Sequence, residues 1–186
     1  YLKKGIDSLK KDSLVIHIVS PTEVNLLGFL KDDSFFERPE FVSAIFDPPQ
    51  IRTGDYSSIE SFIIGLQAYF VPTESTAKLL KVVGNVKGEQ VQQFSDDGYT
   101  QAVTAKAGIA TVENVVVPNP VKLKPFRTFP EIEQPESLFV FRMRQQPGST
   151  PSCGLWEADN KLWKVEAINS IAVWLKDKIQ DVPIIA

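Results

Sequence analysis

Apolar and polar residues alternate in several short runs along the chain, and these runs carry its clearest structural signal. A period of two residues is typical of a strand with one buried face. Leu138–Arg144 follows this pattern, and a polar loop separates it from a second short run at 153–158. Apolar residues with a helical period follow over 166–179. This part of the chain holds all three tryptophans, and it predicts a strand, loop, strand, tight turn and helix that nucleate the core.

Further runs of apolar or alternating residues predict a series of strands. The run at 13–20 is apolar at nearly every position, which is typical of a central strand buried on both faces. Asp97-Gly98 separates two of the runs and predicts a hairpin, because a type I′ turn needs residues that accept positive φ. Strands are expected at 13–20, 24–30, 41–46, 79–86, 89–95, 99–105, 115–117 and 121–124.

Helical periodicity is clear in three places. Residues 1–11 place leucine and isoleucine on one face and lysine on another, which predicts an amphipathic helix. A second helix is predicted over Ser57–Phe70, where Ser57 and Glu60 fit the two ends of a capping box. The C-terminal helix is expected to bury one face, formed by Val165, Ile168, Ala172, Leu175 and Ile179.

The order of these elements predicts an α+β fold, in which a mostly antiparallel sheet is packed by two or three helices. At 186 residues the chain fits one domain. Residues 76–112 are expected to project from it as a polar β-meander. The strands between Glu89 and Ala105 carry few charges that would discourage edge pairing, so we expect a second chain to cover them in a homo-oligomer.

Composition narrows the classes of function. The net charge of −3 argues against a protein that neutralises many phosphates of duplex nucleic acid. The single cysteine, Cys153, excludes an intrachain disulfide framework and fits a reducing compartment, and we expect it to pack in a strand. No apolar run reaches the ~18 residues of a membrane helix. The chain begins at Tyr1 rather than at methionine, so we expect further residues before it.

The sequence contains no catalytic signature. It lacks the glycine-rich loops that bind dinucleotides or phosphates and the Gly-x-Ser-x-Gly elbow of hydrolases. With one cysteine and one histidine, His17, it offers no Cys/His metal site, and no cofactor is expected. The acidic pairs Asp32-Asp33 and Asp96-Asp97 lie in expected turns. An enzyme is therefore the least supported class, although hydrolysis by carboxylates alone stays open.

Aromatic and basic residues come together in one part of the sequence. Phe126 and Arg127 lie in a segment punctuated by prolines, and Arg142 and Arg144 lie on the strand that follows. Arginine binds phosphate or carboxylate through a planar fork and stacks on aromatic rings. Arg142 and Arg144 are two apart on the strand and leave the same face, where Arg127 would join them if the segment pairs with the strand. The alternative is that the phenylalanines are core and the arginines are merely solvated.

Several stretches carry a resemblance to a known family. They are 97–108 (DGYTQAVTAKAG), 125–132 (PFRTFPEI), 134–137 (QPES) and 155–159 (LWEAD). Together they resemble a family of tailed-phage and prophage proteins of the YfdQ-like type, for which no activity is established. The resemblance implies a cytoplasmic protein of an infected bacterium, and it carries over no functional residue.

Three functions fit these observations. The first is a non-catalytic phage-type binding protein that sequesters a small anionic, nucleotide-like ligand or a host protein and so opposes host defence. The second is a virion or assembly component, in which the meander and the proline-punctuated segment make lattice contacts. The third is a recombination accessory that binds single-stranded nucleic acid through the arginines and phenylalanines. The residues predicted to bind a ligand are Phe126, Arg127, Arg142 and Arg144.

Overall fold

A computed structural model of the chain describes residues 13–32, 36–86, 91–96, 101–107, 110–111, 115–116, 119–144 and 149–186. These residues form three helices and mostly antiparallel sheets, which confirms the predicted α+β class. The helix predicted at 1–11 and the turn predicted at Asp97-Gly98 lie outside the described residues.

The chain divides into two compact units, whereas its sequence predicts one domain. Unit 1 consists of Tyr1–Pro48, Arg127–Pro135 and Trp163–Ala186. Unit 2 consists of Pro49–Phe126 and Glu136–Leu162. The chain therefore leaves unit 1 twice, and the stretch that was expected to nucleate one core is shared between the two units.

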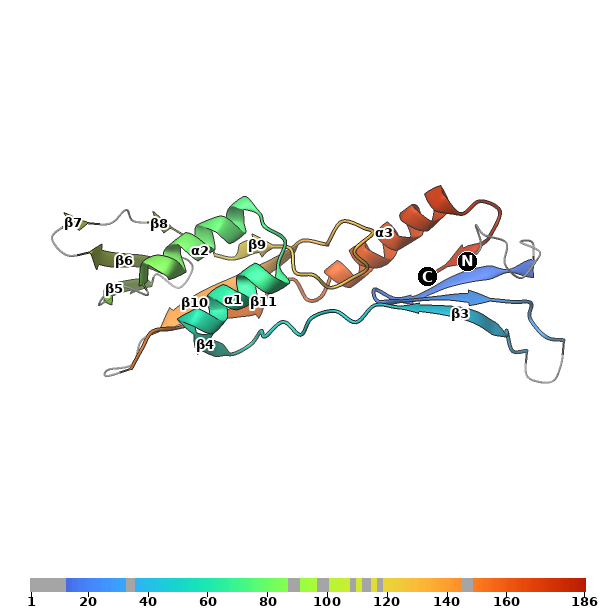
Figure 1. Cartoon of the computed structure of the whole chain (residues 1–186), viewed down its shortest axis with the longest axis horizontal. Coiled ribbons are helices and arrows are strands. Elements are labelled where there is room, and N and C mark those ends of the chain that lie inside the picture. Colours follow the sequence, from blue (N-terminus) through green and yellow to red (C-terminus); the bar gives the residue numbers. More distant parts are fainter. Residues whose placement is uncertain are drawn as a thin grey trace. The chain divides into compact units, whose positions relative to one another are not determined.

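Unit 1 is built on a four-stranded sheet, sheet A, with a helix along one face (Figure 1). The strand order is β12-β1-β2-β3, with β12 parallel to β1 and the other pairs antiparallel. As predicted, the apolar first strand is internal to the sheet. The elements of unit 1 are β1 (Val15–Ser20), β2 (Glu23–Leu27), β3 (Glu40–Ile45), α3 (Trp163–Lys178) and β12 (Ile184–Ile185).

Helix α3 packs on sheet A through most of the predicted face. Leu175 is buried, Ile168, Ala172 and Ile179 are half-buried against the same core, and only Val165 departs from the prediction, at 60% exposed. The centre of the buried face lies slightly to one side, at Ala167 and Ile171, because the helix carries apolar side chains around much of its circumference. The tight turn expected before the helix is present, with Asn160 and Lys161 at positive φ.

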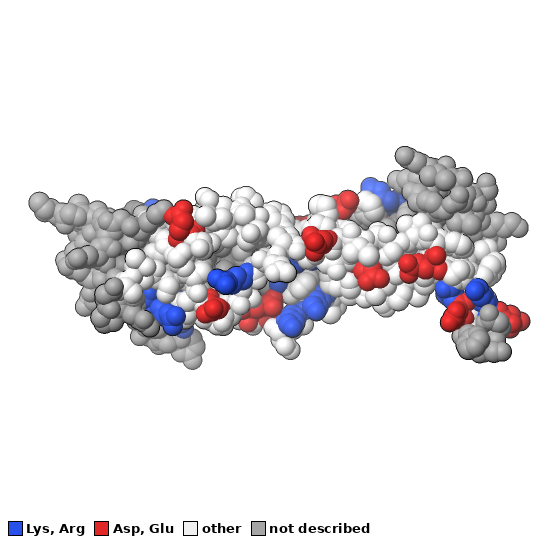
Figure 2. Space-filling model, turned by 60° about the horizontal axis from the view of Figure 1, so that its bottom comes forward, with Lys and Arg blue, Asp and Glu red and all other residues white. Residues whose placement is uncertain are grey.

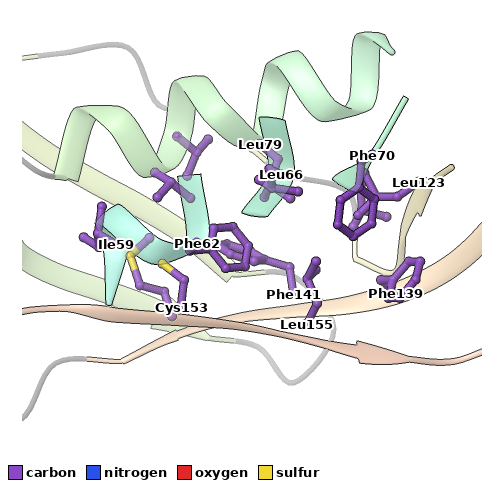
Figure 3. Packing of buried hydrophobic residues seen from close by; sticks show 14 residues of the cluster. Ile59, Phe62, Leu66, Phe70, Leu79, Leu123, Phe139, Phe141, Cys153 and Leu155 are labelled. Atoms are coloured by element: carbon purple, nitrogen blue, oxygen red, sulfur yellow. The ribbon is translucent and has the colours of Figure 1, made fainter. Parts of the chain in front are cut away.

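Unit 2 is built on a second four-stranded sheet, sheet B, whose order is β4-β11-β10-β9 and whose pairs are all antiparallel. Two helices cover one of its faces (Figures 1 and 3). The strands predicted at 138–144 and 153–158 are confirmed as the central pair of this sheet. The elements are β4 (Tyr56–Ser58), α1 (Ile59–Tyr69), α2 (Glu74–Val86), β9 (Val121–Leu123), β10 (Ser137–Arg144) and β11 (Ser152–Glu157).

The core of unit 2 joins these helices to the sheet through aromatic contacts (Figure 3). Phe62 of α1 lies 5.6 Å from Phe141 of β10 between ring centroids, and Phe70 lies 6.1 Å from Phe139. Both β10 rings are almost completely buried. Burial of such rings is the main favourable contribution to the stability of this unit.

The strand predicted at 79–86 is wrong, because these residues belong to helix α2. Thr73 begins the helix: its Oγ1 accepts the backbone N–H of Thr76 at 3.2 Å. The apolar residues of this stretch recur at spacings that fit a helix as well as a strand. Packing on α1 and β9 therefore decides for the helix, and the buried residues are Thr76, Leu79, Val82 and Val83.

The predicted capping box is also wrong by one residue. Ser58 caps α1, and its Oγ accepts the backbone N–H of Ser61 at 3.2 Å. Ser57 lies in β4 opposite Cys153, and its hydroxyl donates to the Cys153 carbonyl at 3.4 Å. Pairing with β11 thus keeps Ser57 extended and moves the start of the helix beyond it.

A third sheet, also in unit 2, contains the remaining strands. They are β5 (Val91–Asp96), β6 (Gln101–Ala107), β7 (Ala110–Thr111) and β8 (Val115–Val116). β5 and β6 pair antiparallel, as predicted, and β7 and β8 both pair with β6. Because 76–86 are helical, the β-structure expected at 76–112 begins with β5.

Candidate functional site: an aromatic and basic sheet face

Sheet B presents a mixed aromatic and basic surface on the face opposite α1 and α2. Alternate residues of β10, from Ser137 to Met143, are buried against the helices, so the residues between them point the other way. The register adds neighbours from the other strands: Lys122 lies opposite Leu138, and Trp156 lies opposite Val140. We call this surface the aromatic–basic face; it comprises Tyr56, Lys122, Leu138, Val140, Arg142, Arg144 and Trp156.

Three of these side chains form one stacked cluster. The Arg144 guanidinium carbon lies 3.9 Å from the centroid of the Tyr56 ring, which is a close cation–π contact. The Tyr56 ring in turn meets the Trp156 ring edge to face, with centroids 4.9 Å apart. Arg144 is exposed and the two rings are half-buried. The cluster thus holds a cation and two aromatic rings in fixed positions within reach of solvent.

Gly154 makes room for this cluster. It lies between Arg142 and Tyr56 in the sheet. A Cβ at this position would come within 2.7 Å of the Trp156 ring and 2.6 Å of the Asp55 carbonyl oxygen, closer than such atoms can approach. Glycine therefore lets the Trp156 ring lie against its own strand.

The other two cations of the face have partners within the protein. Arg142 is half-buried, and its Nη1 donates to the Phe141 carbonyl at 3.3 Å. Lys122 forms an exposed ion pair with Glu136 at 3.0 Å, a type of pair that contributes little to stability.

The structure separates the four predicted ligand-binding residues. Arg142 and Arg144 share one face, with Leu138 and Val140 beside them, as predicted. Phe126 belongs to unit 2 but is half-buried beside α1, where its N–H donates to the Tyr69 carbonyl at 2.9 Å. Arg127 belongs to unit 1. The proline-punctuated segment does pair antiparallel with β10, but through Val121–Leu123 of β9, so Arg127 is not opposite the strand.

Arg127 lies instead in a loop that Gln134 holds together. The Gln134 Oε1 accepts the backbone N–H groups of Arg127 at 2.8 Å and Thr128 at 3.2 Å. Its Nε2 donates to the carbonyls of Thr128 and Phe129, at 3.1 and 3.2 Å. The Arg127 guanidinium carbon lies 4.1 Å from the centroid of the Trp163 ring. These contacts fix Arg127 within the loop of unit 1, where its role is structural.

Charge on one side of the protein is mixed rather than concentrated. On the side shown in Figure 2, the described Lys and Arg side chains are interspersed with Asp and Glu. Binding of an anion on that side would need a local cluster of cations rather than a broad basic surface.

Other candidate chemistry is accounted for. Burial raises the pKa of the Cys153 thiol to about 12, so the residue packs as a small apolar group, as predicted. His17 is half-buried in β1. Within the described residues, no group of three or more His, Cys, Asp or Glu side chains could hold a metal ion.

Cavities lined by described residues lie away from the aromatic–basic face. One of about 430 Å³ lies between α3 and sheet A and is lined by apolar residues, Trp174 and Lys178. A second, of about 240 Å³, shares Trp174 with it. A third, also of about 240 Å³, lies beside α1. None of the three is lined by Trp156, Arg142 or Arg144.

No family model, curated protein or solved structure matches this chain. Among the described residues, no helix is both long and apolar enough to cross a membrane.

Sequence reasoning found the two arginines of the face but missed Tyr56 and Trp156. Pairing the runs at 138–144 and 153–158 as a hairpin would have found Trp156, whereas nothing in the local sequence connects Tyr56 to Arg144.

Proposed function

We propose that this protein is a non-catalytic binding protein for anionic, nucleotide-like ligands and that the aromatic–basic face is its binding surface. The observation that carries the proposal is the stacking of Arg144 on Tyr56 beside Trp156, with Arg142 on the same face. A nucleotide joins a planar base to a phosphate, and this cluster joins planar rings to guanidinium groups.

Each part of such a ligand has a partner on this face. The half-exposed Trp156 ring offers a surface on which a base can stack. Arg142 and Arg144 offer planar donor groups that match phosphate oxygens. Val140 and Leu138 supply an apolar floor between the rings and Lys122.

The biological setting follows from the family resemblance. In a phage or prophage, a cytoplasmic protein of this kind would capture a nucleotide-like signal of the bacterial host and so weaken host defence. The face contacts its ligand by stacking and ion pairing alone, which is what capture requires. Native mass spectrometry of protein from infected cells tests this role by weighing any retained ligand.

The direct test is calorimetric titration of the protein with nucleoside mono- and triphosphates. An Arg142→Ala/Arg144→Ala variant is expected to bind about a hundredfold more weakly or worse, because each truncation removes a charge-assisted bond that contributes about ten- to a hundredfold in affinity. Lys176→Ala, which removes one exposed positive charge from α3, is the charge control and should bind as the parent does. Equal affinity of the parent and the double variant, with both folded, would place the site elsewhere.

We also propose a homo-oligomer. β5 pairs on one side with β6, and β3 pairs on one side with β2; their other edges pair with no described strand. Uncovered edges of this kind pair readily with a second chain. Light scattering at micromolar concentration should give a multiple of the 20.8 kDa chain mass, and a single chain mass would contradict the proposal.

A further inference from the structure

The cations of the aromatic–basic face lie at both of its ends. Lys122 lies in the row of Leu138, and Arg144 lies six residues further along β10. At the rise of a strand, this separation is about 20 Å. Val140, opposite Trp156, lies between the two ends, and Arg142 lies one row before Arg144.

A single nucleotide occupies only part of this order of groups. A mononucleotide carries its charge at one end, so it can engage Arg142 and Arg144 or Lys122, but not both ends of the face. A ligand that repeats phosphate and base can engage both ends and place a base on Trp156 between them. The surface is also a sheet face, and the three cavities described above are not lined by Trp156, Arg142 or Arg144.

We propose that the aromatic–basic face binds a single-stranded oligonucleotide that runs along β10, with phosphates at Lys122 and at Arg142 and Arg144 and a base stacked on Trp156. This inference rests on the proposed function and names the class of ligand for the same surface. A duplex fits poorly, because its bases are stacked on one another and cannot lie on Trp156. The mixed charge of the protein, with a net charge of −3, also favours a ligand held partly by stacking.

The test is a fluorescence anisotropy titration with thymidine oligonucleotides of increasing length. Affinity should rise at least roughly tenfold from the mononucleotide to a strand of about six nucleotides, within the site sizes of known single-strand binders. Three cations that each neutralise one phosphate predict a slope of log affinity against log salt of about −2 for the longer strand. A cyclic dinucleotide and a duplex of matching sequence serve as comparison ligands, and both should bind more weakly.

Four variants probe the Lys122 end of the face and the Trp156 ring between its ends. Lys122→Ala should weaken the longer strand roughly threefold to tenfold and reduce its salt slope by about 0.7, and it should weaken the mononucleotide less than the strand. Glu136→Gln removes the ion-pair partner of Lys122 and should tighten binding of the strand slightly. Trp156→Ala should weaken every ligand that carries a base, and Trp156→Phe, which keeps an aromatic ring, should restore most of the affinity.

The outcomes distinguish this inference from the function on which it rests. Equal affinity for the mononucleotide and the longer strand would contradict the proposal that the ligand is an oligonucleotide. It would still agree with the proposed function of nucleotide binding. Tightest binding of the cyclic dinucleotide or of the duplex would also contradict the oligonucleotide proposal. No binding of any nucleotide would overturn both. Thermal unfolding of each variant, expected to match the parent for Lys122→Ala, shows that a loss of binding is not a loss of folding.

Discussion

Sheets A and B are built alike, with four strands and helical cover on one face, but their other faces carry different polar groups. On sheet A the second face carries Asn25, whose side-chain amide donates to Glu23 at 3.1 Å and to Glu40 at 2.9 Å. The Asn25 Oδ1 accepts the Ser43 hydroxyl at 2.7 Å. Asn25 is only 7% exposed, so its side chain bonds to its neighbours in the sheet rather than to solvent. The group is acidic because it contains Glu23 and Glu40.

On sheet B the second face carries Arg144, stacked on the Tyr56 ring beside Trp156, and Arg142 one row away. An acidic network whose donors and acceptors are paired with one another repels a phosphate. A guanidinium stacked on a ring still presents its outer N–H groups to a phosphate. Two sheets of the same layered architecture thus differ in the residues at alternate strand positions. Of the two, sheet B carries the set that suits the anionic ligand proposed above.

The largest effect is expected in the core of unit 2, on the covered side of sheet B. Phe141→Ala should lower the free energy of unfolding by about 3–5 kcal/mol, because it removes a buried ring and leaves a cavity beside Phe62. Urea denaturation followed by circular dichroism measures the loss. Ile64→Ala, at a position 52% exposed on α1, is the control and should change stability little. A loss below about 1 kcal/mol for Phe141→Ala would show that this core is not the one described.

A smaller effect is expected for the loop of unit 1. Gln134→Ala removes the acceptor of two backbone N–H groups and the donor of two more hydrogen bonds, in a buried setting. Unfolding free energy should fall by about 2–3 kcal/mol, the cost of leaving buried polar groups unpaired. Glu131→Gln, an exposed change in the same loop, serves as its control. If unit 1 and unit 2 unfold in separate transitions, only the transition of unit 1 should move.

Gly154→Ala tests how the binding face is assembled. The added Cβ must displace the Trp156 ring or the Asp55 carbonyl, which should cost about 1–3 kcal/mol of stability. Displacement of Trp156 should also weaken nucleotide binding, as measured by the same titration. Gly84→Ala, where a Cβ would meet nothing within 4 Å in helix α2, should not destabilise the protein. Unchanged binding by a folded Gly154→Ala variant would mean that the position of Trp156 is unimportant.

The smallest effect at neutral pH concerns Cys153. Its pKa is raised by burial to about 12 from an ordinary value of 9.0, so the thiol is protonated in both the folded and the unfolded chain below pH 9. As pH rises from about 9 towards 12, only the unfolded chain ionises, and stability should fall with pH. Cys153→Ala should lose this component of the pH dependence. At pH 8 a thiol reagent should react with the parent only after unfolding, and rapid reaction of the native protein would contradict the burial of Cys153.

What the sequence determined by itself is local. The two-residue period of β10 places Arg142 and Arg144 on one face whatever the strand packs against, because successive side chains of a strand point to opposite sides. The apolar run of β1 required a place inside a sheet, and the lone cysteine required burial, for the same kind of local reason. These features were predicted correctly from their own residues.

What only the tertiary structure decided depends on residues far apart in the chain. α2 carries apolar residues that suit either a helix or a strand, and its packing on α1 and β9 selected the helix. Arg127 and Arg142 are close in sequence but belong to different units, because Gln134 holds Arg127 in a loop of unit 1. Tyr56 reaches Arg144 only because β4 pairs with β11, and such long-range pairing is set by the whole core rather than by the residues that meet.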